Sequence, residues 1–172
     1  VVSAYKTANE GIRETFKQVQ EVPKKVECDI IYEGDVMQGI AKTDPTPEPF
    51  IVPEFIHEIE ASAFNLGTEI ETLIFKGSIR QVAANNCVSL PKLKTVIFED
   101  DVEDIEANAF KGCAALSRVE FHKGLGALWD SCFANCTALE AVDLPDNCEL
   151  IDKNCFSGCI RLKHIHLPEQ VK

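Results

Sequence analysis

The stretch IEANAFKGCAALSRVEF, residues 105–121, decides the fold, because its pattern returns every 23 residues without an insertion. One position of the pattern is phenylalanine in all copies but one: Phe64, Cys87, Phe110, Phe133 and Phe156. Other apolar positions recur with the same step: Ile59, Val82, Ile105, Leu128 and Ile151; Ile70, Leu93, Leu116, Leu139 and Leu162; Leu73, Val96, Val119, Val142 and Ile165; and Phe75, Phe98, Phe121, Leu144 and Leu167. A fixed period of this size indicates a solenoid, in which units too small to bury their own apolar faces stack into one core.

Each unit is predicted to contain short extended segments joined by a short helical turn. Ala109, Phe110 and Cys113 fall at i, i+1 and i+4, which is one face of such a turn. The residue before them is always Ser or Asn, the types that cap a helix N-terminus: Ser62, Asn85, Asn108, Ser131 and Asn154. Val119 and Phe121 alternate with polar residues, as in a strand with one buried face. Stacking of identical units predicts a parallel sheet.

Residues 105–121 resemble the BspA-type leucine-rich repeat, whose pattern runs I-G-x-x-A-F-x-x-C-x-x-L-x-x-I-x-L-P. Segments 139–145 and 162–168 match the end of this motif, including its proline. The resemblance covers about residues 56–172 and departs from the pattern at Cys87 and Trp129. It implies a right-handed, β-rich leucine-rich-repeat solenoid of about five units. Because members of the family are commonly bacterial or protozoan surface proteins, it also implies binding to host proteins or other cells.

Residues 1–49 do not follow the period and are predicted to form an N-terminal cap or the tail of a preceding domain. Apolar residues from Tyr5 to Val19 recur at helical spacing, and Pro23 would end that helix. Alternation over residues 26–30, the turn signal at 33–35 and a return over 36–40 predict a hairpin. The proline-rich segment 44–49 is predicted to be extended. The repeat array is assigned to residues 50–172, and the break where a sixth unit would begin predicts that the native protein continues.

The composition is that of a folded soluble domain, with 45% hydrophobic and 26% charged residues in 172. A net charge of −11 disfavours nucleic acid and anionic membranes as partners. Since no apolar run approaches the roughly 18 residues that a membrane helix needs, no membrane insertion is expected. The sequence leaves the oligomeric state open.

Four cysteines, Cys132, Cys136, Cys155 and Cys159, mimic the ligand spacing of a zinc site. Their longer intervals equal the repeat period, however, so we interpret them as small buried core residues. Disulfides between neighbouring turns are the alternative, although stacked Cβ atoms about 5 Å apart are slightly too far for an easy bridge. Reduced cysteines also leave a cytoplasmic location open beside the cell-surface or secreted one that the resemblance implies.

The outward strand positions are the candidate protein-binding residues. They form three columns at the repeat spacing: Thr72, Thr95, Arg118, Ala141 and His164; Ile74, Ile97, Glu120, Asp143 and His166; and Lys76, Glu99, His122, Pro145 and Pro168. Ile74 and Ile97 are an apolar pair on a face predicted to meet solvent, which suits an interaction site. The alternatives are a covered face or plain β-propensity.

Two sets of polar residues are candidates for ion or acid–base sites. The run 99–106 contains six acids, but Val102 and Ile105 must face the core, which spreads the carboxylates and favours a solvated acidic patch over a calcium site. Glu120, Asp143 and His166 share one column of adjacent strands at about 5 Å spacing, so a metal or acid–base role is the alternative to a solvated charge pair.

The sequence therefore predicts a non-enzymatic protein-interaction module without cofactor or metal. It would act in surface adhesion or recognition through the outward strand face, with a host or cell-surface protein as partner. No nucleophile has a base implied beside it, and no glycine-rich phosphate loop occurs. The alternative is a structural spacer within a longer repeat protein.

Overall fold

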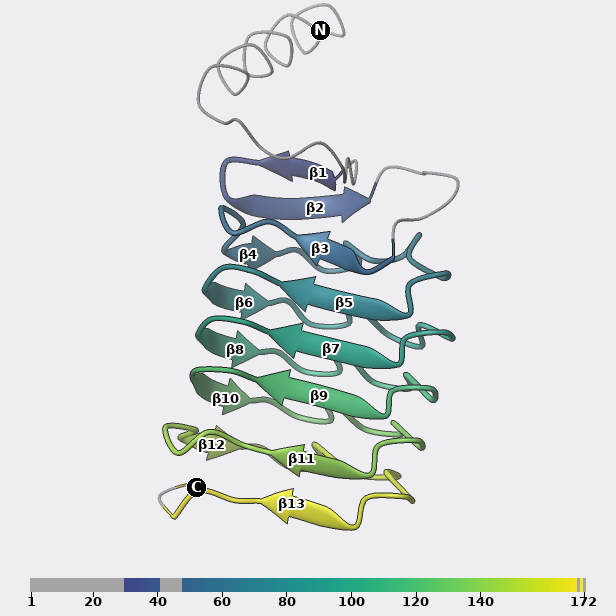
Figure 1. Ribbon diagram of the computed structural model, residues 1–172, viewed down its shortest axis with the longest axis vertical. Coiled ribbons are helices and arrows are strands. Elements are labelled where there is room, and N and C mark those ends of the chain that lie inside the picture. Colours follow the sequence, from purple (N-terminus) through teal and green to yellow (C-terminus); the bar gives the residue numbers. More distant parts are fainter. Residues whose placement is uncertain (1–29, 41–47, 170, 172) are drawn as a thin grey trace, which may run out of the picture.

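The chain folds as a right-handed β-solenoid, in which each coil of backbone stacks on the one before it (Figure 1). The computed structural model describes residues 30–40, 48–169 and 171. The strands are β1 (Ile30–Glu33), β2 (Val36–Ile40), β3 (Phe50–Val52), β4 (Glu58–Ile59), β5 (Thr72–Phe75), β6 (Ile79–Val82), β7 (Thr95–Phe98), β8 (Val102–Ile105), β9 (Arg118–Phe121), β10 (Leu125–Leu128), β11 (Ala141–Asp143), β12 (Leu150–Ile151) and β13 (His164–His166). The predicted leucine-rich-repeat solenoid is confirmed.

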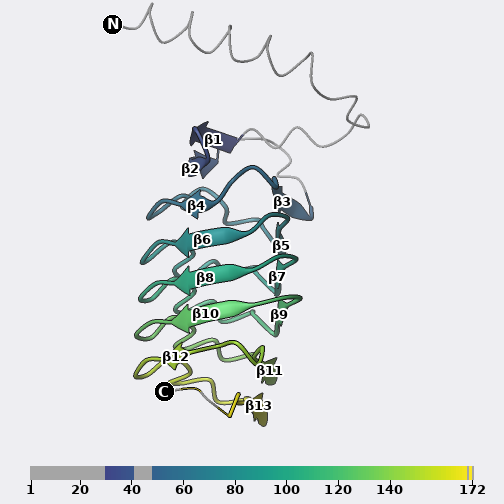
Figure 2. The same ribbon diagram turned by 90° about the vertical axis from the view of Figure 1, so that its left-hand side faces the viewer.

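Two faces of the solenoid are sheets, and turns run along a third side (Figure 2). One face is a seven-stranded sheet in the order β1-β2-β4-β6-β8-β10-β12. The other, which we call the split sheet, has a four-stranded part, β3-β5-β7-β9, and a two-stranded part, β11-β13. Apart from the β1–β2 hairpin, every pair is parallel, and residues of successive coils pair at the repeat offset, as Leu73 does with Val96.

The core is a set of axial columns of buried side chains. Phe110 lies over Phe133 with ring centroids 5.3 Å apart, and Phe133 lies over Phe156 at 5.8 Å, with interplanar angles of 5° and 4°. Phe75, Phe98 and Phe121 form a second stacked column, with centroid distances of 4.7 and 5.3 Å. Burial of each large apolar side chain contributes roughly 1.5–3 kcal/mol, so these columns are the main source of stability.

Cys87 interrupts the first phenylalanine column, and the second column takes over the contacts around it. Phe64 meets Phe75 edge to face at 6.3 Å, and Phe110 meets Phe98 edge to face at 6.5 Å. Cys87 itself is fully buried. The aromatic contacts therefore continue past the missing ring by crossing from one column to the other.

The prediction of short capped helical turns is wrong, because the described residues contain no helix and the Ser/Asn column does not cap one. Ser62, Asn85, Asn108, Ser131 and Asn154 have φ between 57 and 67°, in the left-handed region, whereas a helix N-cap is in the β region. The N–H of Ala109 donates to Glu106 O at 3.1 Å, so Asn108 is the third residue of a β-turn that needs a positive φ. Asparagine tolerates that conformation better than most residues, which explains its recurrence.

The predicted N-terminal hairpin is confirmed for residues 30–40, since β1 and β2 pair antiparallel around Gly34. The β2 strand continues the seven-stranded sheet by pairing in parallel with β4, and Met37 is fully buried against the first coil. Arg80 holds the hairpin turn, with Nη2 2.6 Å from Asp35 and 2.9 Å from Glu58. The helix predicted over residues 5–19, the start of the first strand and most of the proline-rich segment lie outside the described residues. The domain boundary at residue 49 stays a prediction.

The left-handed turn residue gives a first prediction. Asn108→Ala should lower the free energy of unfolding by about 1 kcal/mol, because a Cβ without a polar group disfavours the left-handed conformation. Asn108→Gly should leave stability unchanged or raise it, since glycine adopts a positive φ freely. Urea unfolding followed by circular dichroism measures both. Equal stabilities of the alanine and glycine variants would contradict the left-handed assignment.

A second prediction concerns the close approach of successive coils at Gly77. A Cβ there would lie 2.8 Å from the carbonyl carbon of Glu54, so Gly77→Ala must shift backbone and should cost roughly 1–3 kcal/mol of stability. Gly39→Ala is the matched control, because its Cβ would be 3.8 Å from the nearest atom, Ile31 Cδ1. Thermal unfolding of both variants tests the difference, and a Gly77→Ala protein as stable as the control would be inconsistent with this packing.

Candidate functional site

The structure places the predicted binding residues on the outward side of the split sheet. In β5 and β7 the side chains alternate between half-buried and buried, so Ile74 and Ile97 face outward while their neighbours fill the core. The outward residues are Thr72 and Ile74 on β5, Thr95 and Ile97 on β7, Arg118 and Glu120 on β9, Ala141 and Asp143 on β11, and His164 and His166 on β13. Lys76, Glu99 and His122 directly follow the ends of β5, β7 and β9.

Three isoleucines in register form an apolar strip at the N-terminal end of this face. Ile51 on β3 pairs with Ile74, and Ile74 pairs with Ile97, and all three are half-buried. We call Ile51, Ile74 and Ile97 the isoleucine strip. Ile51 is not among the candidate binding residues predicted from the sequence. The 23-residue spacing from Ile51 to Ile74 would have identified it.

Ion pairs between neighbouring coils border the isoleucine strip on both sides. Lys76 Nζ lies 2.6 Å from Glu99 at one end of β5 and β7, and Lys94 Nζ lies 2.7 Å from Glu71 at the other. The hydrogen bond and charge of Lys94 lower the pKa of Glu71 below its usual value. Exposed pairs of this kind add little stability, but they neutralise the rim and leave the apolar strip as the feature a partner would meet.

The C-terminal half of the same face is polar and titratable. Glu120 contacts Arg118 and accepts a hydrogen bond from His122 Nε2 at 3.0 Å. Asp143 and His166 are register partners on β11 and β13, as expected. His166 Nε2 lies 3.9 Å from Asp146. The face therefore joins an apolar half to a half rich in carboxylates and histidines.

The expectation that Glu120, Asp143 and His166 line up on adjacent paired strands is only partly met. Within the described residues the split sheet is interrupted between β9 and β11, which lie side by side without forming a ladder. Glu120 and Asp143 would be directly opposite each other across that gap, and like charges in such a pair are destabilising. The aromatic column also ends there, since Leu144 follows Phe121.

The acidic run 99–106 is divided among separate partners. Glu99 pairs with Lys76, and Asp100 pairs with Lys123 at 2.9 Å. Asp104 accepts a hydrogen bond from Trp129 Nε1 at 2.8 Å, and Glu106 accepts one from Gln81. Within residues 30–40 and 48–169, no group of three or more His, Cys, Asp or Glu side chains converges as a metal site.

The seven described cysteines are all buried and unbridged, which confirms their interpretation as small core residues. One column has a further role, because each thiol donates to a backbone carbonyl of the preceding coil. The Sγ–O distances are 2.9 Å from Cys113 to Cys87, 3.3 Å from Cys136 to Phe110, and 3.1 Å from Cys159 to Phe133. Burial raises the pKa of Cys113 to about 11, and it also raises the pKa of Cys87 well above the usual value of a cysteine thiol.

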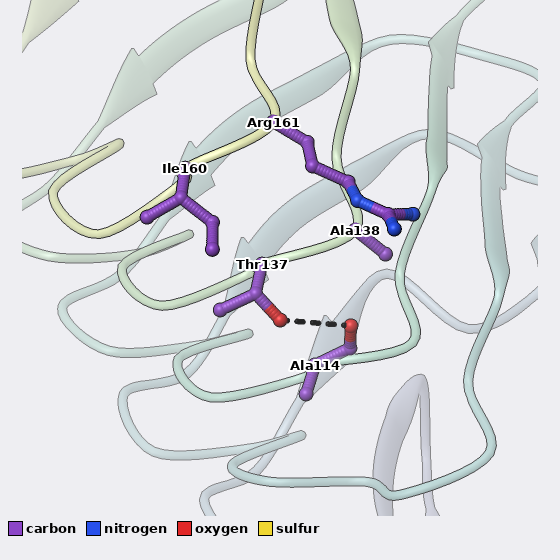
Figure 3. A pocket seen from close by; sticks show the side chains of 5 residues that line it. All are labelled: Ala114, Thr137, Ala138, Ile160 and Arg161. Carbon is purple, nitrogen blue, oxygen red and sulfur yellow. Dashed lines mark hydrogen bonds between the residues drawn. The ribbon is translucent and has the colours of Figure 1, made fainter.

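A separate concavity of about 340 Å³ lies on the turn side of the solenoid. It is lined by residues of three successive coils: Ala114, Thr137, Ala138, Ile160 and Arg161 (Figure 3). The Thr137 hydroxyl donates to Ala114 O at 3.3 Å, while the Arg161 side chain extends over Ala138. None of these residues was singled out from the sequence as a site, because in the repeat pattern they are variable positions.

A stacked array of short parallel strands and tight turns with an outward sheet face is the architecture of a leucine-rich-repeat solenoid. The family model described as "BspA type Leucine rich repeat region" matches residues 48–114 and 84–172, in six copies. The chain therefore belongs to the BspA-type leucine-rich repeat family, as the residue pattern indicated.

The comparison with solved structures found similar leucine-rich repeat proteins. A leucine rich cell surface protein from Faecalibacterium prausnitzii A2-165 aligns with 90% of this chain and 45% of its own, at 16% identity and a TM-score of 0.68. A T. pallidum leucine-rich repeat protein aligns with 57% of this chain and 59% of its own, at 21% identity and a TM-score of 0.44. This chain thus spans less than half of the F. prausnitzii protein.

A comparison with curated protein sequences gave no match. Among the described residues, no helix has the length and apolar character required to cross a membrane.

The buried thiols give a third prediction. Iodoacetamide at pH 8 should leave the seven described cysteines unlabelled in the native protein, because burial excludes the reagent. At Cys113 and Cys136 burial also raises the pKa and so disfavours the reactive thiolate. A thiol with a raised pKa stabilises the fold below its unfolded pKa and loses that contribution as the pH rises through the folded value. The contribution of these raised-pKa thiols to the free energy of unfolding should therefore be fully present up to about pH 8 and fall above about pH 9.

Peptide mapping by mass spectrometry identifies the labelled positions, and a sample unfolded in urea is the control in which every cysteine should react. Rapid native labelling of Cys113 or Cys136 would contradict their placement in the core.

Proposed function

We propose that this chain is a non-enzymatic protein-binding module of a cell-surface protein, and that the isoleucine strip is the centre of its binding face. The partner would be a host or cell-surface protein, and the role would be adhesion or recognition. No catalytic residue, cofactor or nucleic-acid partner forms part of the proposal.

The observation that carries the proposal is the register of Ile51, Ile74 and Ile97 on an open sheet face. Isolated exposed apolar residues are common, but these three are axial neighbours and so make one continuous surface. Thr72 and Thr95, which pair in register beside the strip, extend it with half-buried methyl-bearing side chains.

The surroundings of the strip fit a protein partner. An apolar centre with a polar rim is the usual plan of a protein–protein interface, and the Lys76–Glu99 and Lys94–Glu71 pairs provide that rim. The backbone edges of the inner strands are already paired within the sheet, so a partner would bind across the strand face through side chains.

The family and the fold support the surface location. Repeat solenoids present extended surfaces to their partners, and the F. prausnitzii protein with this fold is described as a cell surface protein. The net charge of −11 makes nucleic acid an unfavourable partner.

The fourth prediction tests the strip directly. The variant with Ile74→Asp and Ile97→Asp should lose binding to a protein recovered from solubilised host cell-surface proteins, with affinity lowered by at least about tenfold, because charge is placed in the apolar centre. Biosensor measurements with the purified partner give the affinity, and circular dichroism checks that the array remains folded.

Leu66→Asp is the matched control, since Leu66 is also an exposed apolar residue but lies outside the split sheet. It should bind as the unchanged protein does. Equal binding by all three proteins would move the site away from the strip, and retention of no partner by any of them would favour the spacer role.

A further inference from the structure

The concavity on the turn side combines an apolar wall with Arg161, a cation for which the described residues provide no ion-pair partner. Ile160 is 82% exposed, which is more than any other large hydrophobic residue that the structure describes. Ala114 and Ala138 supply methyl groups to the same hollow, and Arg161 borders it (Figure 3). A single exposed isoleucine is common on protein surfaces. An exposed isoleucine that lines a hollow beside a charge without an ion-pair partner is a candidate ligand site.

The repeat itself explains why Arg161 is unpaired. Four lysines pair with an acid one period earlier in the chain, and Lys76 pairs with Glu99 one period later. The four are Lys92 with Glu69, Lys94 with Glu71, Lys123 with Asp100 and Lys163 with Glu140. The residue one period before Arg161 is Ala138, which offers no carboxylate. Of the arginines that the structure describes, Arg80 and Arg118 contact carboxylates, and Arg161 has none within the 4.0 Å that defines an ion pair.

The same substitution of small residues creates the hollow. In the earlier coils the two columns that line it hold Thr68 and Pro91, and the paired Glu69 and Lys92. In the later coils they hold Ala114, Ala115 and Ala138, which are too short to fill the space below Ile160 and Arg161. The concavity of about 340 Å³ is open to solvent, so it suits partial burial of a group about the size of one residue.

The donors at the hollow point to a carboxylate. The Thr137 hydroxyl is already used on Ala114 O, so among the lining side chains the guanidinium of Arg161 is the free donor. A guanidinium matches a carboxylate with two parallel N–H···O bonds. Ile160 and Arg161 line the same hollow, so a small ligand that carries an apolar group and a carboxylate would contact both.

We propose that this concavity binds the carboxyl-terminal residue of a partner polypeptide, with an aliphatic last side chain against Ile160, Ala114 and Ala138 and the terminal carboxylate at Arg161. A terminal residue carries both groups on one Cα, whereas an internal Asp or Glu carries its carboxylate in place of the apolar side chain. The site is on the turn side, so it is independent of the isoleucine strip and does not require the proposed function of that strip.

The fifth prediction uses N-acetyl-L-leucine as the smallest mimic of such a chain end. Titration into the isotope-labelled chain should give saturable NMR shift changes at the methyl groups of Ala114, Thr137 and Ala138. N-acetyl-L-leucinamide, which lacks the carboxylate, should bind at least about fivefold more weakly, as should N-acetyl-L-leucine to the Arg161→Gln variant, because an exposed charged contact is worth about 1 kcal/mol. Ile160→Ser should weaken binding of both compounds.

The control is Lys153→Gln, which removes one exposed positive charge away from the hollow and should bind as the unchanged chain does. The N-methylamide of N-acetyl-L-aspartate tests the other source of a carboxylate and should bind weakly. The proposal is overturned if no saturable shift changes occur up to about 50 mM ligand. A dissociation constant of that size corresponds to a binding free energy of only about −2 kcal/mol. It is also overturned if the amide or the aspartate derivative binds as well, or if Arg161→Gln behaves like Lys153→Gln.

Discussion

Parallel pairing of successive coils at a constant offset of 23 residues is the constraint on which the rest of the structure depends. A coil this short cannot enclose its own apolar side chains, so each inward position must be covered by the same position of the next coil. This explains why Phe110, Phe133 and Phe156 stack as parallel rings, and why the defect at Cys87 is bridged by Phe75 and Phe98 rather than left open. The core is thus a property of the stack and not of any single unit.

The constant offset between successive coils also determines which side chains are neighbours on the surface of the molecule. A side chain on the surface has the equivalent side chain of the next coil as its nearest axial neighbour, and therefore opposite charges one period apart meet as ion pairs. Isoleucines one period apart become a continuous apolar strip by the same rule. Where the rule is broken, the surface changes character. Ala138 offers Arg161 no carboxylate one period earlier, and the described residues provide no other ion-pair partner for it. The sequence of Glu120 followed by Asp143 coincides with the interruption of the split sheet.

The two candidate surfaces would bind partners of different chemistry and size. The isoleucine strip lies on the outward face of three neighbouring strands, β3, β5 and β7, and is bordered by ion pairs, so it would bind a partner by apolar contact across the strands. The concavity at Ile160 and Arg161 is small and carries one unpaired cation, so it would select a short group by charge and size. Both surfaces are consistent with a repeat fold that exposes extended faces and encloses little internal space. Neither surface requires a change in the repeat core.

Periodicity alone determined the solenoid, the parallel strands, the burial of the cysteines and the outward columns, because a fixed spacing of apolar residues dictates which side chains stack. It also contained Ile51, one period before Ile74, but a single weak copy beside a proline-rich segment did not stand out. Only the tertiary structure decided the rest. Ser and Asn before a short apolar turn fit a helix cap and a left-handed turn residue equally well, and backbone dihedral angles alone separate the two. The gap between β9 and β11 and the hollow beside Arg161 both arise from contacts between neighbouring coils. The spacing of residues in a sequence does not show whether two adjacent strands form hydrogen bonds. It also does not show whether small side chains leave a space between coils.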